Sequence, residues 1–377
     1  MPRFPWDLLA PYGQKARAHP DGIVDLSVGT PVDPVPEVVQ DALRAAANAP
    51  GYPATHGTRA LREAAAGWLA RRHGVTVDPD TVLPLIGTKE FIASLPALLG
   101  CGPGDVVAYP DLAYPTYDIG ARLAGAGPVR WEGFPAAGRA PGPPIAATNR
   151  PPPVPPGRVR LAWVNSPSNP TGRVLGPTAL RDAAAWVRDQ GAVLASDECY
   201  IGLGWDAEPA SVLHPDVCGG SFGGLLAVHS VSKRSNLAGY RAGFVTGDPA
   251  LVAQLLEIRK HAGMMMPAPV QAAMAAALTD DAHAERQRGV YAARRDQLRP
   301  ALEKAGWTIT HSEAGLYLWA SRPGDDCWSS VELLAGAGIL VAPGEFYGPA
   351  GAQHIRVALT ATDERVAAAI HRLATLS

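Results

Sequence analysis

The sequence predicts an α/β fold in two parts: a large domain whose mostly parallel sheet lies between helices, and a smaller α+β domain. Up to about residue 248, apolar runs of strand length alternate with amphipathic helical stretches, which is typical of a parallel sheet covered on both faces. Beyond that residue, long helical stretches are followed by short strands. A chain of 377 residues is long enough for roughly two domains.

The large domain has six strand candidates, each a short apolar run. Residues 88–100 and 178–191 are predicted helices, because their apolar residues recur three or four positions apart and each stretch ends in glycine. We expect a ligand at the carboxyl ends of the strands, where the unusual residues collect. In chain order the strand candidates are VLPLIG (82–87), VVAYP (106–110), LAWVNSP (161–167), AVLASDE (192–198), LLAVHS (225–230) and AGFVTG (242–247).

The smaller domain is predicted to contain three short strands and a last helix from Thr362. We expect the N-terminal residues to join it, because a helix-like stretch at 36–47 precedes the first strand of the large sheet. The large domain is therefore expected to span 49–248, and the small one 1–48 and 249–377, with 249–280 bridging the two. The three strands are GLYLWAS (315–321), ILVAP (339–343) and HIRVAL (354–359).

A proline-rich segment interrupts the large domain. Between Pro141 and Gly157, eight of seventeen residues are proline, which forbids a helix and disfavours a central strand. We expect an extended surface excursion there.

Composition excludes several classes of function. The net charge of -2 offers no basic surface for nucleic acid, and no apolar run has the length of a signal peptide or a membrane span. The four cysteines show neither a CxxC pair nor metal-ligand spacing, so we expect reduced thiols and no metal site. A cytoplasmic protein that binds small molecules, and neither nucleic acid nor membrane, is expected.

Lys233 stands in the run SVSKRSNLAGYRAGF (230–244), which is the most informative stretch of the chain. Lysine is the only side chain that can form a Schiff base with an aldehyde cofactor. The hydroxyls of Ser230 and Ser232 and the guanidinium of Arg241 could hold a phosphate dianion beside it. The combination suggests pyridoxal phosphate, and the alternative is a solvated surface lysine.

Eight motifs follow one another in an order and spacing that resemble fold type I pyridoxal-phosphate enzymes, specifically the class I/II aminotransferases. The resemblance covers almost the whole chain, and it implies a seven-stranded sheet and a homodimer with shared active sites. The motifs are SVGTP (27–31), GYPATHGTRALR (51–62), GTKE (87–90), YPDLAYPTY (109–117), NSPSNPTG (165–172), SDECY (196–200), SVSK (230–233) with Arg241, and IRVALT (355–360).

The resemblance implies a catalytic role for three residues. Lys233 would carry the cofactor and move the proton of the substrate α-carbon. Asp197 would pair with the pyridine nitrogen, and a helix-capping aspartate is its structural alternative. Tyr200 and Asn169 would hydrogen-bond the phenolate oxygen of the cofactor, although Asn169 could otherwise be a simple turn residue.

The resemblance also assigns the remaining contacts with cofactor and substrate. Tyr114 would stack on the pyridine ring, unless it is a loop aromatic packed on the core. Tyr52 would reach the phosphate of the neighbouring subunit. Arg356 would grip the substrate carboxylate, assisted by Gly29 and Asn169, and a structural salt bridge is the alternative. The phosphate would be held by Gly87, Thr88, the backbone of Lys89, Ser230, Ser232 and Arg241.

The leading prediction is an aminotransferase that moves an amino group between an amino acid and a 2-oxo acid. The chain most resembles the actinobacterial succinyldiaminopimelate transaminases of lysine biosynthesis, which implies N-succinyl-LL-2,6-diaminopimelate and 2-oxoglutarate as substrates. The alternatives are another donor (LL-diaminopimelate, aspartate or an aromatic amino acid), a β-lyase of the same fold, and a regulator fused to a DNA-binding module. We expect the basic residues Lys89, Arg17, Arg259 and Lys260 at the mouth of the pocket.

Overall fold

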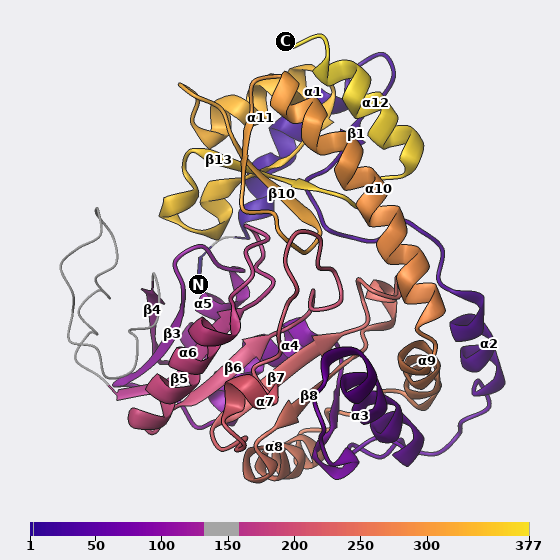
Figure 1. Cartoon of the computed structure of the whole chain (residues 1–377), viewed down its shortest axis with the longest axis vertical. Coiled ribbons are helices and arrows are strands. Elements are labelled where there is room, and N and C mark those ends of the chain that lie inside the picture. The colour runs from indigo at the N-terminus through magenta and orange to yellow at the C-terminus, as the bar shows by residue number, and fades with distance from the viewer. Residues whose placement is uncertain (3, 132–157, 377) are drawn as a thin grey trace.

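The large sheet lies in the lower part of the molecule in Figure 1, with helices packed around it. The computed structural model describes residues 1–2, 4–131 and 158–376, and within them a seven-stranded sheet has the order β2-β8-β7-β6-β5-β3-β4. Strand β8 runs antiparallel to both its neighbours, and every other pair is parallel. The predicted α/β class is confirmed. The strands are β2 (Leu83–Leu85), β3 (Asp105–Pro110), β4 (Gly127–Trp131), β5 (Arg158–Asn165), β6 (Val193–Asp197), β7 (Leu225–Ser230) and β8 (Gly243–Gly247).

All six predicted strands of the large domain are present, and β4 is the one that the sequence did not reveal. Among the described residues this strand pairs only with β3, so it forms an edge of the sheet that they build. Its residues GPVRW are mostly half-exposed, and Pro128 is tolerated because an edge strand need not donate every backbone hydrogen bond. An edge strand of this kind lacks the continuous apolar run that marks a central parallel strand.

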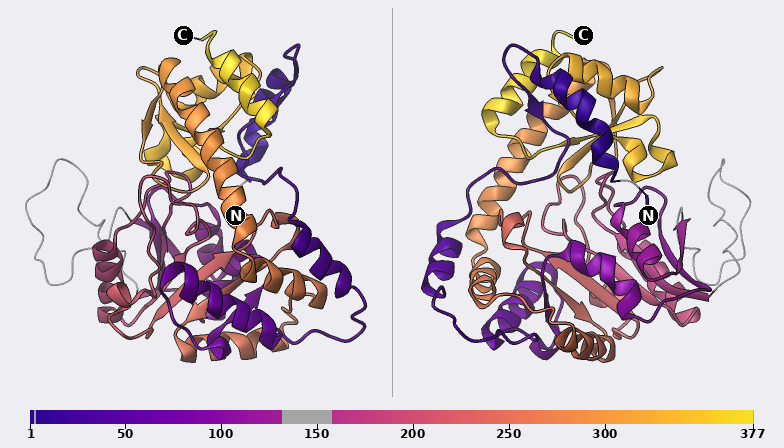
Figure 2. Two further views of the ribbon diagram at one scale, coloured as in Figure 1. Left: turned by 45° about the vertical axis from the view of Figure 1, so that its right-hand side comes forward. Right: turned by 180° about the vertical axis from the view of Figure 1, so that it is seen from behind.

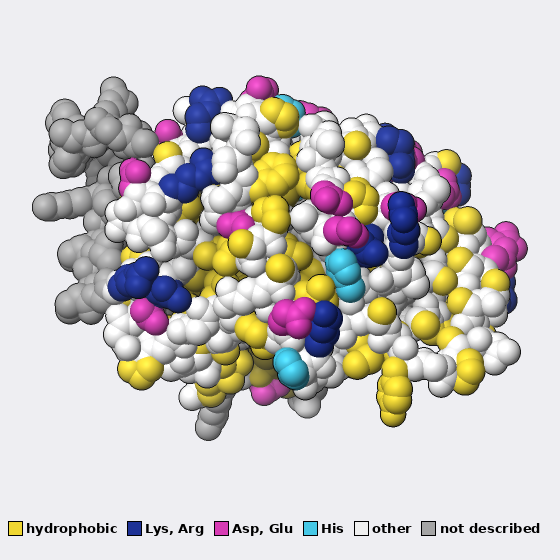
Figure 3. All heavy atoms as spheres, turned by 90° about the horizontal axis from the view of Figure 1, so that it is seen from below, with side chains coloured by type: hydrophobic (Ala, Val, Ile, Leu, Met, Phe, Trp, Pro, Cys, Tyr) yellow, Lys and Arg dark blue, Asp and Glu magenta, His cyan; other side chains and the backbone are white. Residues whose placement is uncertain are grey.

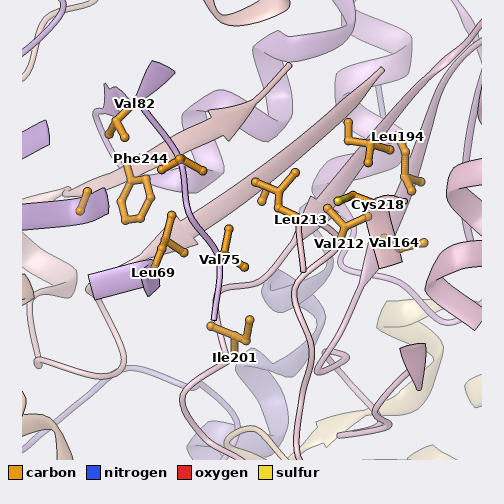
Figure 4. Close-up of a cluster of buried hydrophobic side chains, with 14 of the residues drawn as sticks. Leu69, Val75, Val82, Val164, Leu194, Ile201, Val212, Leu213, Cys218 and Phe244 are labelled. Carbon is orange, nitrogen blue, oxygen red and sulfur yellow. The ribbon is translucent and has the colours of Figure 1, made fainter. Parts of the chain in front are cut away.

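Helices bury both faces of the sheet. Consecutive residues of a strand point to opposite faces, and Val106 and Val107 of β3 belong to two different hydrophobic clusters. The first cluster, which includes Leu69, Val164 and Phe244, is shown in Figure 4. The predicted helices at 88–100 and 178–191 correspond to α4 and α6. The helices of this region are α3 (Arg59–His73), α4 (Thr88–Leu98), α5 (Thr116–Leu123), α6 (Pro177–Asp189), α7 (Pro215–Cys218), α8 (Pro249–His261) and α9 (Ala268–Thr279).

The C-terminal part forms a second body above the sheet in Figures 1 and 2. A four-stranded antiparallel sheet has the order β12-β13-β10-β9, and β11 pairs in parallel with β1 near the N-terminus. The predicted strand at 339–343 is therefore divided between two sheets. The elements are β1 (Val24–Asp25), β9 (Thr308–Thr310), β10 (Tyr317–Ser321), β11 (Ile339–Leu340), β12 (Ala342–Pro343), β13 (His354–Ala358), α1 (Ala10–Arg17), α10 (Ala282–Lys304), α11 (Cys327–Gly336) and α12 (Asp363–Leu373).

The N-terminal residues contact both bodies. Helix α1 packs against α11 of the small body, whereas α2 (Glu37–Ala45) packs against α9 beside the large sheet. Val39 of α2 belongs to the same hydrophobic cluster as Leu69 and Phe244. The domain boundaries at residues 48 and 249 stay a prediction. The proline-rich segment at 141–157 lies outside the described residues.

Charged side chains of both signs are interspersed on the face shown in Figure 3. None of the helices in the described ranges combines the length and the hydrophobicity that a membrane crossing requires.

Candidate active site

A cavity of about 1300 Å³ opens at the carboxyl edge of the large sheet, and residues of both bodies line it. Asn165, Asp197 and Ser230, which lie in this lining, are the last residues of β5, β6 and β7. The parallel strands therefore bring these side chains to one place, as the sequence predicted. The other predicted site residues that line the cavity are Gly29, Thr88, Lys89, Tyr114, Asn169, Tyr200, Ser232, Lys233, Arg241 and Arg356.

Lys233 follows β7 and projects into this cavity, where its Nζ donates a hydrogen bond to the carbonyl oxygen of Gly29. Burial lowers the pKa of the Lys233 amine, because a charged ammonium is poorly solvated there. A lowered pKa makes more of the neutral, nucleophilic amine available. Lys233 is therefore suited to react with a carbonyl group.

The Asp197 carboxylate is buried and held on two sides. Its Oδ2 accepts a hydrogen bond of 2.7 Å from the Tyr117 hydroxyl, and its Oδ1 accepts one of 3.2 Å from the backbone N–H of Cys199. Burial raises the pKa of the Asp197 carboxyl, while these two hydrogen bonds oppose the shift. A cationic N–H group in the cavity would stabilise the ionised form.

Tyr200 lies three residues after the end of β6, and its hydroxyl contacts that of a second tyrosine. Its hydroxyl oxygen lies 3.0 Å from that of Tyr317, on β10 of the small body. Burial, together with Tyr317, raises the pKa of Tyr200 well above its usual value. Tyr200 therefore stays protonated and can act as a hydrogen-bond donor toward an oxygen in the cavity.

Arg356 on β13 is buried, with 3% of its surface exposed. Its Nη1 donates to Asn169 Oδ1 at 2.8 Å, and its Nη2 donates to the Ser27 carbonyl oxygen at 2.7 Å. The guanidinium carbon lies 3.9 Å from the ring centroid of Tyr317. Within the described residues no Asp or Glu side chain pairs with Arg356 and its Nε has no partner, so its charge can meet an anionic ligand.

The N-terminus of α4 and the loop after β7 together form a site that suits a phosphate. Gly87 precedes the helix with φ of 75°, and a Cβ there would lie 2.3 Å from Arg241 Nη2. Only glycine therefore allows the guanidinium so close to the start of the helix. Thr88, Ser232 and Arg241 line the adjoining cavity. Hydroxyls, a guanidinium and a helix N-terminus are the groups that bind phosphate in proteins.

Two predicted residues do not line the cavity, Gly87 and Tyr52. Gly87 lies behind Arg241, and its lack of a side chain leaves room for the Arg241 guanidinium. Tyr52 is 98% exposed, so its placement in a neighbouring subunit stays a prediction. Tyr114 lines the cavity and its ring lies edge-on to Tyr117, with 6.1 Å between centroids.

The prediction about the mouth of the pocket was mostly wrong. Only Lys89 of its four basic residues lines the cavity. Arg259 is buried against Glu90, and Lys260 pairs with Glu257. The basic side chains that line the cavity in their place are Arg122 and Arg130.

Sequence reasoning also missed Tyr117 and Tyr317. Tyr117 belongs to the motif YPDLAYPTY, so its aromatic character was in view, but its contact with Asp197 depends on how α5 packs on the sheet. Tyr317 stands in an apolar strand, where its ring alone explains its presence. The spacing of residues in the sequence did not indicate the contact that either hydroxyl makes.

The chain matches the family described as aminotransferase class I and II over residues 21–373, and it belongs to that family. The enzyme is a pyridoxal-phosphate-dependent aminotransferase with the fold type I architecture. The cavity residues fit this cofactor, since a reactive lysine, a buried carboxylate and a phosphate site surround one space. The bound cofactor supplies an electron-withdrawing ring that stabilises negative charge on the substrate α-carbon.

Two relatives are 61% identical to this chain. One is the 4-dedimethylamino-4-oxo-anhydrotetracycline transaminase OxyQ of Streptomyces rimosus, aligned over 99% of both chains. The other is the probable aminotransferase Rv1178 of Mycobacterium tuberculosis, aligned over 99% of this chain and 85% of the relative. A solved structure of a probable N-succinyldiaminopimelate aminotransferase from Thermus thermophilus superposes with a TM-score of 0.85 and 29% identity, covering 99% of this chain and 100% of the other.

Proposed function

We propose that the enzyme transfers the amino group of N-succinyl-LL-2,6-diaminopimelate to 2-oxoglutarate, as a cytoplasmic homodimer of diaminopimelate and lysine biosynthesis. The observation that carries the proposal is a large cavity whose lining includes Arg356 and Lys89 as cationic groups for the two ends of a substrate. A donor with a carboxylate at each end requires both. The name of the structurally similar Thermus thermophilus protein agrees with this substrate.

In this proposal the cofactor is held by the residues at the sheet edge. Lys233 would hold it covalently and would move the α-proton of the substrate, and Asp197 would keep the ring nitrogen protonated. Tyr200 and Asn169 donate hydrogen bonds to the ring oxygen, and Tyr114 stacks on the ring. The phosphate is bound by Thr88, the backbone of Gly87 and Lys89, Ser230, Ser232, Arg241 and, from the neighbouring subunit, Tyr52.

Arg356 binds the α-carboxylate of the substrate with Gly29 and Asn169 beside it. The guanidinium is already oriented, because Asn169 and Ser27 accept two of its hydrogen bonds. Nη1 and Nη2 each carry a second N–H hydrogen, which remains for the incoming anion. A planar guanidinium of fixed orientation can bind a carboxylate through two parallel hydrogen bonds.

Lys89 binds the distal carboxylate of the succinyl group. Its Nζ lies 5.6 Å from the ring centroid of Phe4 and pairs with no carboxylate among the residues that the structure describes. Arg122, the next cation in the lining, is already engaged by Asp118 at 2.7 Å. Lys89 is exposed, so its ammonium can meet the carboxylate of a ligand that enters the cavity beside the Phe4 ring.

A second candidate is an aminotransferase that acts on a polycyclic ketone. The relative OxyQ, which is 61% identical, is named for such a substrate. Apolar side chains of the N-terminal segment and of the two helices α4 and α5 would pack against fused rings. The apolar residues that line this part of the cavity include Phe4, Trp6, Leu8, Ile92, Ile119, Leu123 and Phe346.

A donor screen with 2-oxoglutarate as acceptor separates these functions. Succinyldiaminopimelate is expected to give the highest kcat/KM, above LL-diaminopimelate, aspartate and aromatic donors. Amination of a polycyclic ketone with glutamate as donor, in the absence of turnover of succinyldiaminopimelate, would favour the second candidate. Release of ammonia and pyruvate from a β-substituted amino acid would indicate a β-lyase.

A further inference from the structure

We propose that Tyr317 is a positioning residue whose hydroxyl directs the hydroxyl of Tyr200 toward the cofactor. The inference rests on the proposed contact between Tyr200 and the ring oxygen of the cofactor, and it concerns a residue that the motifs do not mark. Tyr317 lines the cavity, and its oxygen lies 3.0 Å from that of Tyr200.

The protein makes room for the Tyr317 hydroxyl and not only for its ring. A Cβ on Gly29 would lie 2.1 Å from the Tyr317 hydroxyl oxygen and 2.8 Å from the carbon that bears it. An alanine in place of Gly29 would therefore exclude a tyrosine in this orientation, since real Cβ atoms do not approach so closely. The space beside the Gly29 backbone is thus occupied by the hydroxyl oxygen of Tyr317.

The contact between the two hydroxyls determines which of them donates the hydrogen bond. Each tyrosine has a single O–H hydrogen and can also accept a hydrogen bond. If Tyr200 donates its hydrogen to the cofactor oxygen, the hydrogen of the 3.0 Å contact must come from Tyr317. A hydroxyl that accepts a hydrogen bond becomes a stronger donor, because adjacent hydrogen bonds polarise one another. Tyr317 therefore strengthens the hydrogen bond that Tyr200 makes in the cavity.

The ring of Tyr317 has a separate role. Tyr317 and Arg356 lie on adjacent antiparallel strands, where Arg356 pairs with Trp319, two residues along from Tyr317. Side chains at such diagonal positions lie on the same face of the sheet. The guanidinium carbon of Arg356 is 3.9 Å from the Tyr317 ring centroid. The ring therefore supports the carboxylate-binding arginine, and the hydroxyl supports Tyr200.

The test compares Tyr317→Phe, which keeps the ring, with Tyr317→Leu, which removes both groups. The pH titration of the absorption of the bound cofactor is followed in the absence of substrate. In Tyr317→Phe the titration midpoint is expected to rise by about 0.3–1 pH unit, since a weaker hydrogen bond stabilises the phenolate form less. Its kcat should fall by about 3- to 10-fold, with a change of less than about twofold in KM for the donor.

In Tyr317→Leu the KM for the amino donor should rise as well, because Arg356 loses its ring support. Tyr347→Phe is the matched control: Tyr347 is also buried with its ring 4.9 Å from Arg356, but its hydroxyl has no partner among the described residues. This variant should leave the titration midpoint unchanged.

Tyr200→Phe separates the role of Tyr317 from the proposed contact between Tyr200 and the cofactor. If it shifts the midpoint and Tyr317→Phe does not, Tyr317 has no such role and the proposed cofactor contact of Tyr200 stands. If Tyr200→Phe leaves the midpoint unchanged, the proposed contact of Tyr200 fails, and the inference about Tyr317 fails with it.

Discussion

The hydroxyl of Tyr117 donates a hydrogen bond of 2.7 Å to Oδ2 of Asp197, which joins helix α5 to the end of strand β6. The Tyr117 ring is fully buried and stacks on Trp163 with 5.0 Å between centroids. The hydroxyl therefore has little freedom to move away. Because it donates to the carboxylate, Tyr117 favours the ionised form of Asp197 in a place where burial disfavours it.

Replacing Asp197 with asparagine should leave the cofactor bound but slow transamination by several powers of ten. A neutral amide cannot keep the ring nitrogen protonated, so the cofactor loses its ability to stabilise negative charge on the substrate. Single-turnover kinetics with a saturating donor measures the effect. Near-normal turnover would be incompatible with the proposed role of Asp197.

Tyr117→Phe should have a smaller effect in the same direction. It removes one hydrogen bond to a charged group, worth about 1.5–3 kcal/mol, and therefore lowers kcat by roughly 10- to 150-fold at most. The ring remains to stack on Trp163, so the melting temperature is expected to change little. An unchanged kcat would show that the contact with Cys199 suffices to hold the carboxylate.

Lys233→Ala should abolish covalent attachment of the cofactor, because the alanine offers no amine at that position. Reduction of the wild-type enzyme with borohydride, followed by peptide mapping, should place the modification on Lys233. Lys89 is the other lysine in the lining of the same cavity, so it is the competing site of modification. A modified Lys89 in place of Lys233 would overturn the assignment.

A mixed dimer tests whether Tyr52 acts across an interface. One subunit carries Tyr52→Phe and the other Lys233→Ala, so that exchange of Tyr52 leaves one site free of both changes and the other with both. Activity should recover above that of either parent variant in proportion to the mixed dimer formed. The 98% exposure of Tyr52 in the single chain motivates the experiment. A mixture that never exceeds the better parent would show that Tyr52 acts in its own subunit or has no role.

Lys89→Met should raise KM for the succinylated donor far more than KM for a short neutral amino acid. Only the longer donor would lose a charge-assisted contact, worth roughly 1.5–3 kcal/mol or about 10- to 150-fold in kcat/KM. Lys260→Met is the control, because Lys260 is paired with Glu257 and does not line the cavity. Equal effects of Lys89→Met on both donors would restrict Lys89 to the phosphate site.

The buried pair of Glu198 and His229 predicts a pH-dependent stability. Burial raises the pKa of Glu198 from 4.5 to about 7, and it lowers the pKa of His229 well below its usual value. Between pH 4.5 and about 7, Glu198 is ionised in the unfolded chain but protonated in the folded chain. Rising pH therefore favours unfolding in this range. The contribution of Glu198 to stability is therefore complete below about pH 4.5 and is lost as the pH rises through 7.

The measurement is the difference in melting temperature between wild type and Glu198→Gln. As the pH rises from about 5 to about 8, the melting temperature of the wild type should fall relative to that of Glu198→Gln. Glu257→Gln serves as a surface control: Lys260 lowers the pKa of Glu257, so this carboxyl is ionised in both states between about pH 5 and about 8 and the difference should not vary with pH. A difference that does not vary with pH would mean that Glu198 stays ionised throughout this range.

The sequence predicted the central strands and the residues at their ends, because a strand buried on both faces is a continuous apolar run and its polar last residue is conspicuous. It did not predict the contacts of Tyr117 and Tyr317, which depend on how helix α5 and the small sheet pack against the large one. Arg259 illustrates the same difficulty. The resemblance led us to expect it at the mouth of the pocket, but its side chain pairs with Glu90 and none of it is exposed.

The reversed direction of β8 has a consequence for how the site can vary. Strand β7 ends at Ser230 on the cavity edge, and β8 begins at Gly243 opposite that same residue. The short connection between them therefore starts and ends at the cavity, and it supplies both Lys233 and Arg241 to the lining. A parallel β8 would need a crossover and would begin at the far edge. A change in the length of the segment 231–242 would therefore displace Lys233 and Arg241 together, because both of its ends are fixed in paired strands.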